Sequence, residues 1–380
     1  MTLRAGLRNL GQFVALWATF LIPSLLIAAE PAEPADIFVS GAGGYLFYRI
    51  PAMVITNNET ILAFCEGRKG NRGDRGNIDL VLRRSEDEGR TWKPIQLVHE
   101  EGGDAKIVIG NPCPVVDRET GTIWLPFCRN NLDVFVTHSD DDGRTWATPQ
   151  KITSDVKKPE WGWYATGPGN GIQLTHRTHK GRLVIPCDHR VTAIADKFES
   201  SRSHVIYSDD HGKSWKLGGV TDPKMNECAV AELPDGRLLL NMRSFRGKAC
   251  RASSTSGDGG LTWSAPVDEP VLVESACQAS MIRVGRRPRE AKQMLGWAGM
   301  LVFSNPAVTK GRNHLTMRFS WDDGQTWPDK YLIYEGMSAY SSLAYFPNGT
   351  IGILFERDTY KRISLRTISP EQIFPKDRRR

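Results

Sequence analysis

The eight-residue word SDDDGRTW at residues 139–146 recurs along this 380-residue chain and decides which fold it can adopt. Its four near-copies are SEDEGRTW at 85–92, SDDHGKSW at 208–215, SGDGGLTW at 256–263 and SWDDGQTW at 320–327. Ser and Asp side chains bond backbone amides in tight turns, and Gly supplies the positive φ that such turns need. The word therefore predicts a hairpin turn followed by a tryptophan at a fixed position.

The segments around these words alternate apolar and polar residues, a pattern typical of β-strands, and no long helix is predicted after residue 30. Examples are IDLVLRRS (78–85), LDVFVTHS (132–139), SHVIYSD (203–209) and LTMRFS (315–320). The words start about 59 residues apart, which is room for about four short strands and typical of a β-propeller blade. We therefore expect an all-β, six-bladed β-propeller in which one blade lacks the word or is assembled from both chain ends.

A calcium loop is the alternative interpretation of an Asp-rich turn. The EF-hand pattern places acids five, three and one residues before its glycine. In the copy at 139–146 these positions are His138, Asp140 and Asp142, and no copy has acids at all three. We therefore interpret the word as scaffold and expect neither a metal site nor a cofactor.

Composition and the N-terminus indicate an exported globular protein. Hydrophobic residues make up 40% of the chain and the net charge is +6, with a basic run only in the terminal KDRRR, so no nucleic-acid partner is expected. Arg4 and Arg8 precede an apolar run from Phe13 to Ala29, which is typical of a secretory signal peptide. We expect a signal peptide at 1–29, a linker at 30–36 and a catalytic domain at 37–380.

The expected location is therefore periplasmic or secreted. The apolar run has 17 residues, which approaches a membrane-spanning length, so an uncleaved N-terminal anchor is the alternative. Membrane association is expected only in that case.

The seven cysteines carry no CxxC or metal-ligand spacing. Several of them end apolar runs, as in ILAFC (61–65), IWLPFC (123–128) and RLVIPC (182–187). This predicts buried free thiols in strands, with one disulfide as the alternative in an oxidising compartment.

Five segments do not repeat, and function is expected there. They are FYRIPAM (47–53), EGRKGNRGDRGNIDLVLRRS (66–85), NECAVAELPDGRLLLNMRS (226–244), NPAVTKGRNHLTMRFS (305–320) and GMSAYSSLAYFPNGTIGILFE (336–356). The YRIP and AYSSL motifs, in order among five Asp-rich words, resemble the bacterial-type exo-α-sialidases (neuraminidases) with Asp-box, or BNR, repeats. The resemblance covers about residues 37–372 and implies a glycoside hydrolase acting on terminal sialic acids of glycans, glycoproteins or glycolipids.

The resemblance implies a carboxylate-binding arginine triad. Arg49 of YRIP matches the first arginine, Arg243 of NMRS the second, and Arg312 of GRNHL the third, with Arg318 close behind it. Glu356 matches the glutamate that steadies the first arginine. Three guanidinium groups can hold the carboxylate of a sialic acid by charge-assisted hydrogen bonds.

The resemblance also implies the catalytic groups. Asp74 in the Gly-rich loop matches the acid/base, while Glu227 and Tyr340 match the nucleophile pair. A neutral tyrosine is not repelled by the substrate carboxylate, and sialidases are among the glycosidases with a tyrosine nucleophile. Arg68 matches an arginine near C4 of the sugar, and Asn111 lies where the family commonly faces the sugar. The implied reaction retains configuration through a tyrosyl intermediate.

Two other functions remain open at this point. A hydrolase of a related nonulosonic or ulosonic acid would have the same carboxylate clamp, formed by Arg49, Arg243 and Arg312, and the same nucleophile, but a different C5 pocket. A non-catalytic propeller that binds acidic glycans, a lectin, would not need Asp74 or Tyr340. Both residues are present, which favours the hydrolase.

Overall fold

The computed structural model describes residues 1–2, 33–284 and 299–374. The predicted signal peptide thus lies almost wholly outside the described residues, as do residues 30–32 of the predicted linker. Strand β1 (Ala35–Val39) begins inside the segment predicted as linker. Among the described residues, no helix is long and apolar enough to cross a membrane.

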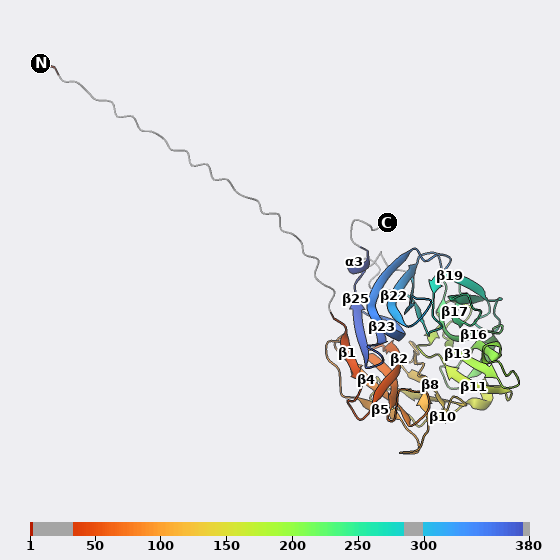
Figure 1. Ribbon diagram of the computed structural model, residues 1–380. Coiled ribbons are helices and arrows are strands. Elements are labelled where there is room, and N and C mark those ends of the chain that lie inside the picture. Colours follow the sequence, from red (N-terminus) through yellow and green to blue (C-terminus); the bar gives the residue numbers. More distant parts are fainter. Residues whose placement is uncertain (3–32, 285–298, 375–380) are drawn as a thin grey trace. The chain divides into compact units, whose positions relative to one another are not determined.

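The strands form four sheets of four or five strands and one sheet of seven, and the sheets follow one another around a common centre (Figure 1). The first sheet contains β2 (Phe47–Ile55), β3 (Ile61–Arg68), β4 (Ile78–Ser85) and β5 (Gln96–His99). The second contains β6 (Ile109–Gly110), β7 (Val115–Val116), β8 (Ile123–Arg129), β9 (Asp133–Ser139) and β10 (Gln150–Lys151). The third contains β11 (Trp161–Thr166), β12 (Ile172–Gln173), β13 (Leu183–Val191), β14 (Ser201–Ser208) and β15 (Lys216–Val220).

The fourth sheet contains β16 (Met225–Glu232), β17 (Leu238–Ser244), β18 (Cys250–Ser256) and β19 (Val267–Val273). The seven-stranded sheet contains β20 (Ser280–Arg283), β21 (Leu301–Pro306), β22 (Asn313–Ser320), β23 (Asp329–Tyr345), β24 (Ile351–Arg357), β25 (Arg362–Ile368) and β1. The helices are single turns: α1 (Thr153–Val156), α2 (Lys197–Ser200) and α3 (Pro370–Ile373). The all-β class is therefore confirmed.

The prediction of six blades is wrong, because the structure has four blades and one continuous seven-stranded sheet. The cause is β23, a strand of 17 residues. Its first part pairs with β22 and its second part with β24, so one strand joins two groups that the repeat spacing had counted separately. The last sheet is completed from both chain ends, since β1 pairs antiparallel with β25.

The Asp-box words are scaffold, as predicted. Each begins at the last residue of a strand, as at Ser139 of β9, and leads into the turn. Asp141 accepts hydrogen bonds from Ser139 Oγ and the Thr145 amide, both at 2.8 Å, and Gly143 has a φ of 77°. Burial alone would raise the pKa of Asp141, but hydrogen bonds from Thr145 and Ser139 lower it to about 2. The carboxylate is thus occupied by the turn itself.

The tryptophan that ends each word contributes to the packing between neighbouring sheets. Trp146 packs edge-on against Phe64 of the preceding sheet, with ring centroids 5.6 Å apart. Both rings belong to an apolar cluster that includes Leu62, Leu125 and Phe127 from β3 and β8. The core therefore lies between successive sheets. Residues at the strand ends opposite the Asp-box turns are not needed for this packing and can form a site.

All seven cysteines are buried and free, as predicted.

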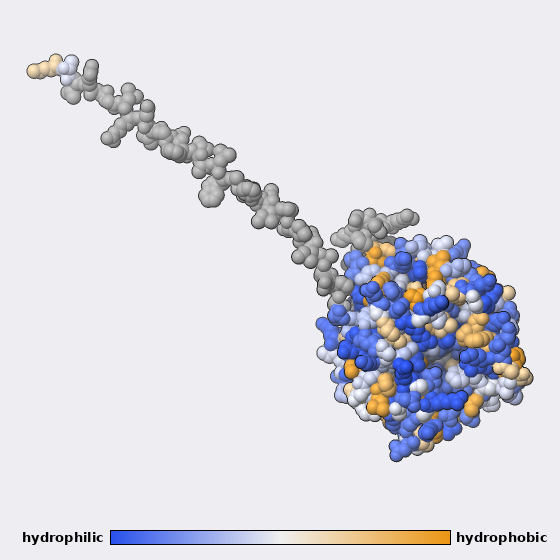
Figure 2. Space-filling view, in the orientation of Figure 1, coloured by the Kyte–Doolittle hydropathy of each residue, from blue (hydrophilic) through white to orange (hydrophobic). Residues whose placement is uncertain are grey.

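The face shown in Figure 2 is mainly hydrophilic, with hydrophobic residues in small separate groups.

Candidate active site

The nine residues singled out from the sequence lie in one connected group of contacts, which Asn111 joins through Glu66. They come from the first two blades, the fourth blade and the seven-stranded sheet. In the first blade β3 and β4 pair along their length. Ser85, where an Asp-box begins, pairs with Ile61 at one end of the two strands, and Arg68 pairs with Ile78 at the other end. The site therefore lies at the strand ends opposite the Asp-box turns.

The YRIP motif forms a β-bulge that aims its arginine. The register between β2 and β3 shifts between Arg49 and Ala52, and Ile50 has a φ of 62°, an outlier for a β-branched residue. The strained bulge is held because the Ile50 amide donates to Glu356 Oε1 at 2.9 Å. Arg49 consequently lies in the site although it is 8% exposed.

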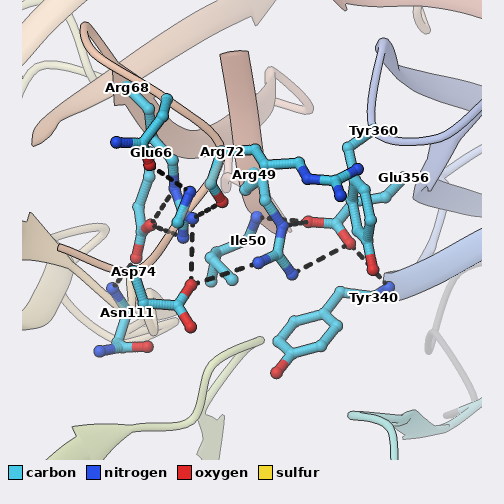
Figure 3. Close-up of polar contacts among 12 residues, drawn as sticks. Arg49, Ile50, Glu66, Arg68, Arg72, Asp74, Asn111, Tyr340, Glu356 and Tyr360 are labelled. Atoms are coloured by element: carbon cyan, nitrogen blue, oxygen red, sulfur yellow. Dashed lines mark hydrogen bonds and ion pairs between the residues drawn. The ribbon is translucent and has the colours of Figure 1, made fainter.

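Glu356 is the hub of this side of the site (Figure 3). It is fully buried on β24 and accepts from Arg49 Nε at 3.1 Å and from Arg49 Nη2 at 3.5 Å. Its Oε2 also accepts from the Tyr340 amide at 3.1 Å. Burial alone would lower the pKa of Arg49, but Glu356, together with Tyr340, Asp74 and Tyr360, outweighs burial and raises it above its ordinary value. One carboxylate thus fixes the first arginine, the bulge and the strand that carries Tyr340.

Tyr340, Glu227 and Arg243 form a chain of polar contacts. The Tyr340 hydroxyl donates to Glu227 Oε1, and Arg243 Nη1 donates to Glu227 Oε2 at 2.8 Å. Burial raises the pKa of Tyr340 well above its usual value and Glu227 adds to the rise, while Arg243 and Arg312 oppose it. The tyrosine is thus neutral in the free protein, and its proton already points to a carboxylate.

Two arginines flank the Tyr340 ring. The Cζ atoms of Arg49 and Arg312 lie 5.3 and 5.5 Å from its centroid. Arg312 Nη1 donates to the hydroxyl of Tyr360 at 3.1 Å. The predicted triad is therefore grouped around one tyrosine, which suits a small anionic group above it.

Asp74 lies on the loop between β3 and β4. Its Oδ1 accepts from Arg49 Nη1 at 3.2 Å and from Arg68 Nη1 at 3.0 Å, while 65% of its side chain remains exposed (Figure 3). Asp74 is therefore accessible from solvent and in contact with the first arginine of the clamp.

Glu66 and Tyr360 were not predicted from the sequence. Glu66 is buried, binds Arg68 Nε at 3.0 Å and accepts from the Asn111 amide at 2.9 Å. An acid at the end of the apolar run ILAFC was a signal that could have revealed it. Tyr360 lies in the β24–β25 turn, and nothing in its sequence context distinguishes it.

Within residues 33–284 and 299–374, no group of three or more His, Cys, Asp or Glu side chains could hold a metal ion. The charged groups at the site are instead the arginines 49, 68, 243 and 312 and the carboxylates of Asp74, Glu227, Glu356 and Glu66. Arg49, Arg68 and Arg243 form ion pairs with these carboxylates, whereas Arg312 donates to Tyr360. Such an arrangement can bind a carboxylate and move protons to and from an oxygen.

Comparison with known proteins identifies the family. The family described as "BNR repeat-like domain" matches residues 59–353. "Sialidase" of Micromonospora viridifaciens is 34% identical over 89% of this chain and 55% of its own length, and "Sialidase" of Bacteroides fragilis (strain YCH46) is 33% identical over 84% and 62%. The chain thus spans somewhat more than half of these relatives. The solved structure of "Hadza microbial sialidase Hz136" has a TM-score of 0.79 at 32% identity, over 88% of this chain and 68% of that one. The chain belongs to the sialidase family with BNR repeats.

Proposed function

We propose that this protein is a retaining exo-α-sialidase that hydrolyses terminal sialic acids through a tyrosyl intermediate. The observation that carries the proposal is the contact of the Tyr340 hydroxyl with Glu227, in the middle of three arginines. The relatives named sialidase support the substrate class. Sialylated glycoproteins or glycolipids are the proposed partners.

Substrate binding begins with exchange of ion pairs. In the free protein Arg49 Nη1 is paired with Asp74, while Nε and Nη2 are held by Glu356. A sialic acid carboxylate competes with Asp74 for Nη1 but leaves the buried Glu356 pair in place. Binding therefore loosens Asp74 from the clamp as the glycosidic oxygen arrives near it.

The first step makes the enzyme–sugar bond. Asp74 first takes up a proton from solvent once the substrate carboxylate has displaced it from Arg49. The Tyr340 oxygen then attacks the anomeric carbon and the tyrosine proton passes to Glu227, while the bond to the leaving oxygen breaks and Asp74 gives that oxygen its proton. A tyrosine of raised pKa stays neutral until Glu227 accepts the proton, so the substrate carboxylate meets no negative nucleophile. Proton transfer and attack are therefore expected to occur together.

The second step releases the sugar. Asp74, now ionised, takes a proton from a water molecule that attacks the same carbon, and the Tyr340 oxygen leaves as Glu227 returns its proton. Two inversions at one carbon give net retention. Once Asp74 returns its proton to solvent, the protein has the protonation states it had at the start.

Release of fluorophore from an aryl α-N-acetylneuraminoside tests the proposal. An activated leaving group needs little acid assistance, so Tyr340→Phe should lower kcat by several orders of magnitude and Asp74→Ala by far less. On a natural sialoside both should be severe, because general acid catalysis contributes about 10²–10⁴-fold. Proton NMR of the first product should show the α-anomer. A β-anomer, or full activity in Tyr340→Phe, would refute the mechanism.

The same assay separates the alternative functions. A wild type that is silent on this substrate but active on the deaminated sugar would be a hydrolase of a related ulosonic acid. Binding of both sugars without turnover would identify a lectin. Tyr164→Phe is the matched control, because it removes one hydroxyl, bonded to the Val156 carbonyl, from a tyrosine of β11 that touches none of the clamp arginines.

We also propose that residues 1–29 direct export. Mass spectrometry of the protein isolated from its source should then find a mature N-terminus near residue 30. An intact N-terminus recovered with the membrane fraction would identify the segment as an anchor instead.

A further inference from the structure

Tyr360 stands between two arginines of the clamp. Its hydroxyl accepts from Arg312 Nη1 at 3.1 Å, and the Cζ atom of Arg49 lies 4.6 Å from its ring centroid. The Cζ atom of Arg72, on the loop that carries Asp74, lies 6.0 Å from the same centroid. Figure 3 shows the ring beside Glu356 and Arg49 at the edge of the site. One aromatic side chain therefore lies against the first arginine, the third arginine and the loop that carries Asp74.

The backbone that places Tyr360 is strained. Asp358, Thr359 and Tyr360 have φ values of 54°, 58° and 65°, the only three consecutive non-glycine residues with positive φ in the described part of the chain. L-residues visit this region as single residues, and a β-branched threonine is especially disfavoured there. Such strain persists where surrounding contacts over-determine the conformation, and it is concentrated at functional sites.

Contacts from several elements hold this turn. The two Asp358 oxygens accept from the Tyr334 hydroxyl at 2.5 Å and from Arg357 Nη1 at 2.8 Å. The Tyr360 carbonyl accepts from Ser40 Oγ at 3.1 Å, and the Ser40 amide donates to the Lys361 carbonyl at 2.9 Å. The turn is thus fixed by β23, by its own hairpin and by the segment after β1. None of these bonds involves the Tyr360 side chain, which instead contacts Arg312 and Arg49.

We propose that Tyr360 is a positioning residue of the carboxylate clamp, acting through Arg312 and Arg49. Two guanidinium groups that must converge on one carboxylate repel each other when the site is empty. The electron-rich ring faces Arg49 and the hydroxyl accepts from Arg312, so both cations are attracted to the orientation in which they are needed. Arg312 has no carboxylate partner among the ion pairs of the described residues, unlike Arg49 and Arg243. The third arginine therefore depends on Tyr360 most.

The inference rests on the proposed function only in that the ligand carries a carboxylate. It is tested by binding of 2-deoxy-2,3-didehydro-N-acetylneuraminic acid to the full chain, measured by calorimetry. Tyr360→Phe keeps the ring but loses the Arg312 bond, and should weaken binding about fivefold to tenfold. Tyr360→Leu also loses the ring over Arg49 and should weaken binding further.

A double-mutant cycle with Arg312→Ala distinguishes positioning from a general structural role. Because Tyr360 acts through this arginine, Tyr360→Phe in the Arg312→Ala background should change Kd less than about twofold. Tyr164→Phe, which loses a buried hydroxyl bond to the Val156 carbonyl away from this hairpin, should lower the melting temperature and leave Kd within about twofold.

Equal effects of Tyr360→Phe with and without Arg312 would overturn the inference, as would unchanged binding in Tyr360→Phe or no binding to the wild type. A wild type that binds without hydrolysing would refute the proposed function and leave the cycle interpretable. The two proposals therefore fail separately.

Discussion

Glu356→Gln is the substitution that best tests how the clamp is built. It keeps the volume of a fully buried side chain but removes its charge and one acceptor. Glutamine Oε1 can still accept from Arg49 Nε and the Ile50 amide, which lie 3.1 and 2.9 Å from Glu356 Oε1. Its amide nitrogen would instead face two donors, Arg49 Nη2 and the Tyr340 amide.

The expected cost follows from these contacts. Each buried donor left without an acceptor costs about 1–3 kcal/mol. Two such donors give about 2–6 kcal/mol, and breaking a buried ion pair by removing one partner costs about 3–5 kcal/mol. We therefore expect Glu356→Gln to lower the free energy of unfolding by about 3–5 kcal/mol, with an unchanged urea m-value.

The same variant should bind the didehydro sialic acid at least tenfold more weakly, because Arg49 is no longer held and the bulge at Ile50 can relax. Asp117→Asn is the control: Asp117 is also fully buried, but it accepts from Thr120 Oγ1 and Gln173 Nε2 and contacts none of the site residues. It should lower stability without changing Kd. A loss under about 1 kcal/mol in Glu356→Gln, with unchanged Kd, would show that Glu356 does not organise the clamp.

Two further predictions concern close packing and pH. A Cβ at Gly110 would lie 2.3 Å from Glu66 Oε1, so Gly110→Ala should raise KM and lower the free energy of unfolding by about 1–3 kcal/mol. Gly257→Ala is the control and should do neither, because nothing lies within 4 Å of a Cβ there. Equal effects of the two substitutions on urea unfolding and on activity would contradict this. Burial lowers the pKa of His189 to about 3 and that of His204 well below its usual value. The unfolded chain takes up protons there below about pH 6.5 and the folded chain does not, so the free energy of unfolding should fall as pH drops from 6.5 toward 3, by up to about 1.4 kcal/mol per pH unit for each histidine. Urea unfolding at pH 7, 6 and 5 measures this, and His189→Gln should flatten the profile; a flat wild-type profile would refute the account.

The Asp-box turns were predictable from sequence because their physics is local. In the copy at 139–146 the partners of Asp141 are Ser139 and Thr145, two and four residues away. Strand alternation between the words is equally local, so the all-β class and the scaffold role could both be predicted. The candidate residues of the site came from the resemblance to a family, which named nine residues that the fold brings together but did not give their contacts.

The number of blades was decided by tertiary structure. No residue pattern in Asp329–Tyr345 indicates that this strand pairs along its length with two different partners. The length of a strand depends on where its partner strands end, and the partners here are β22 and β24. Glu66 and Tyr360 escaped prediction for the same reason. Tyr360 meets Arg312 48 positions earlier, and Glu356 meets Arg49 307 positions earlier. The sequence by itself thus determined the turns, the strands and the chemical groups available, whereas only the closure of the sheets around a common centre brought those groups into one site.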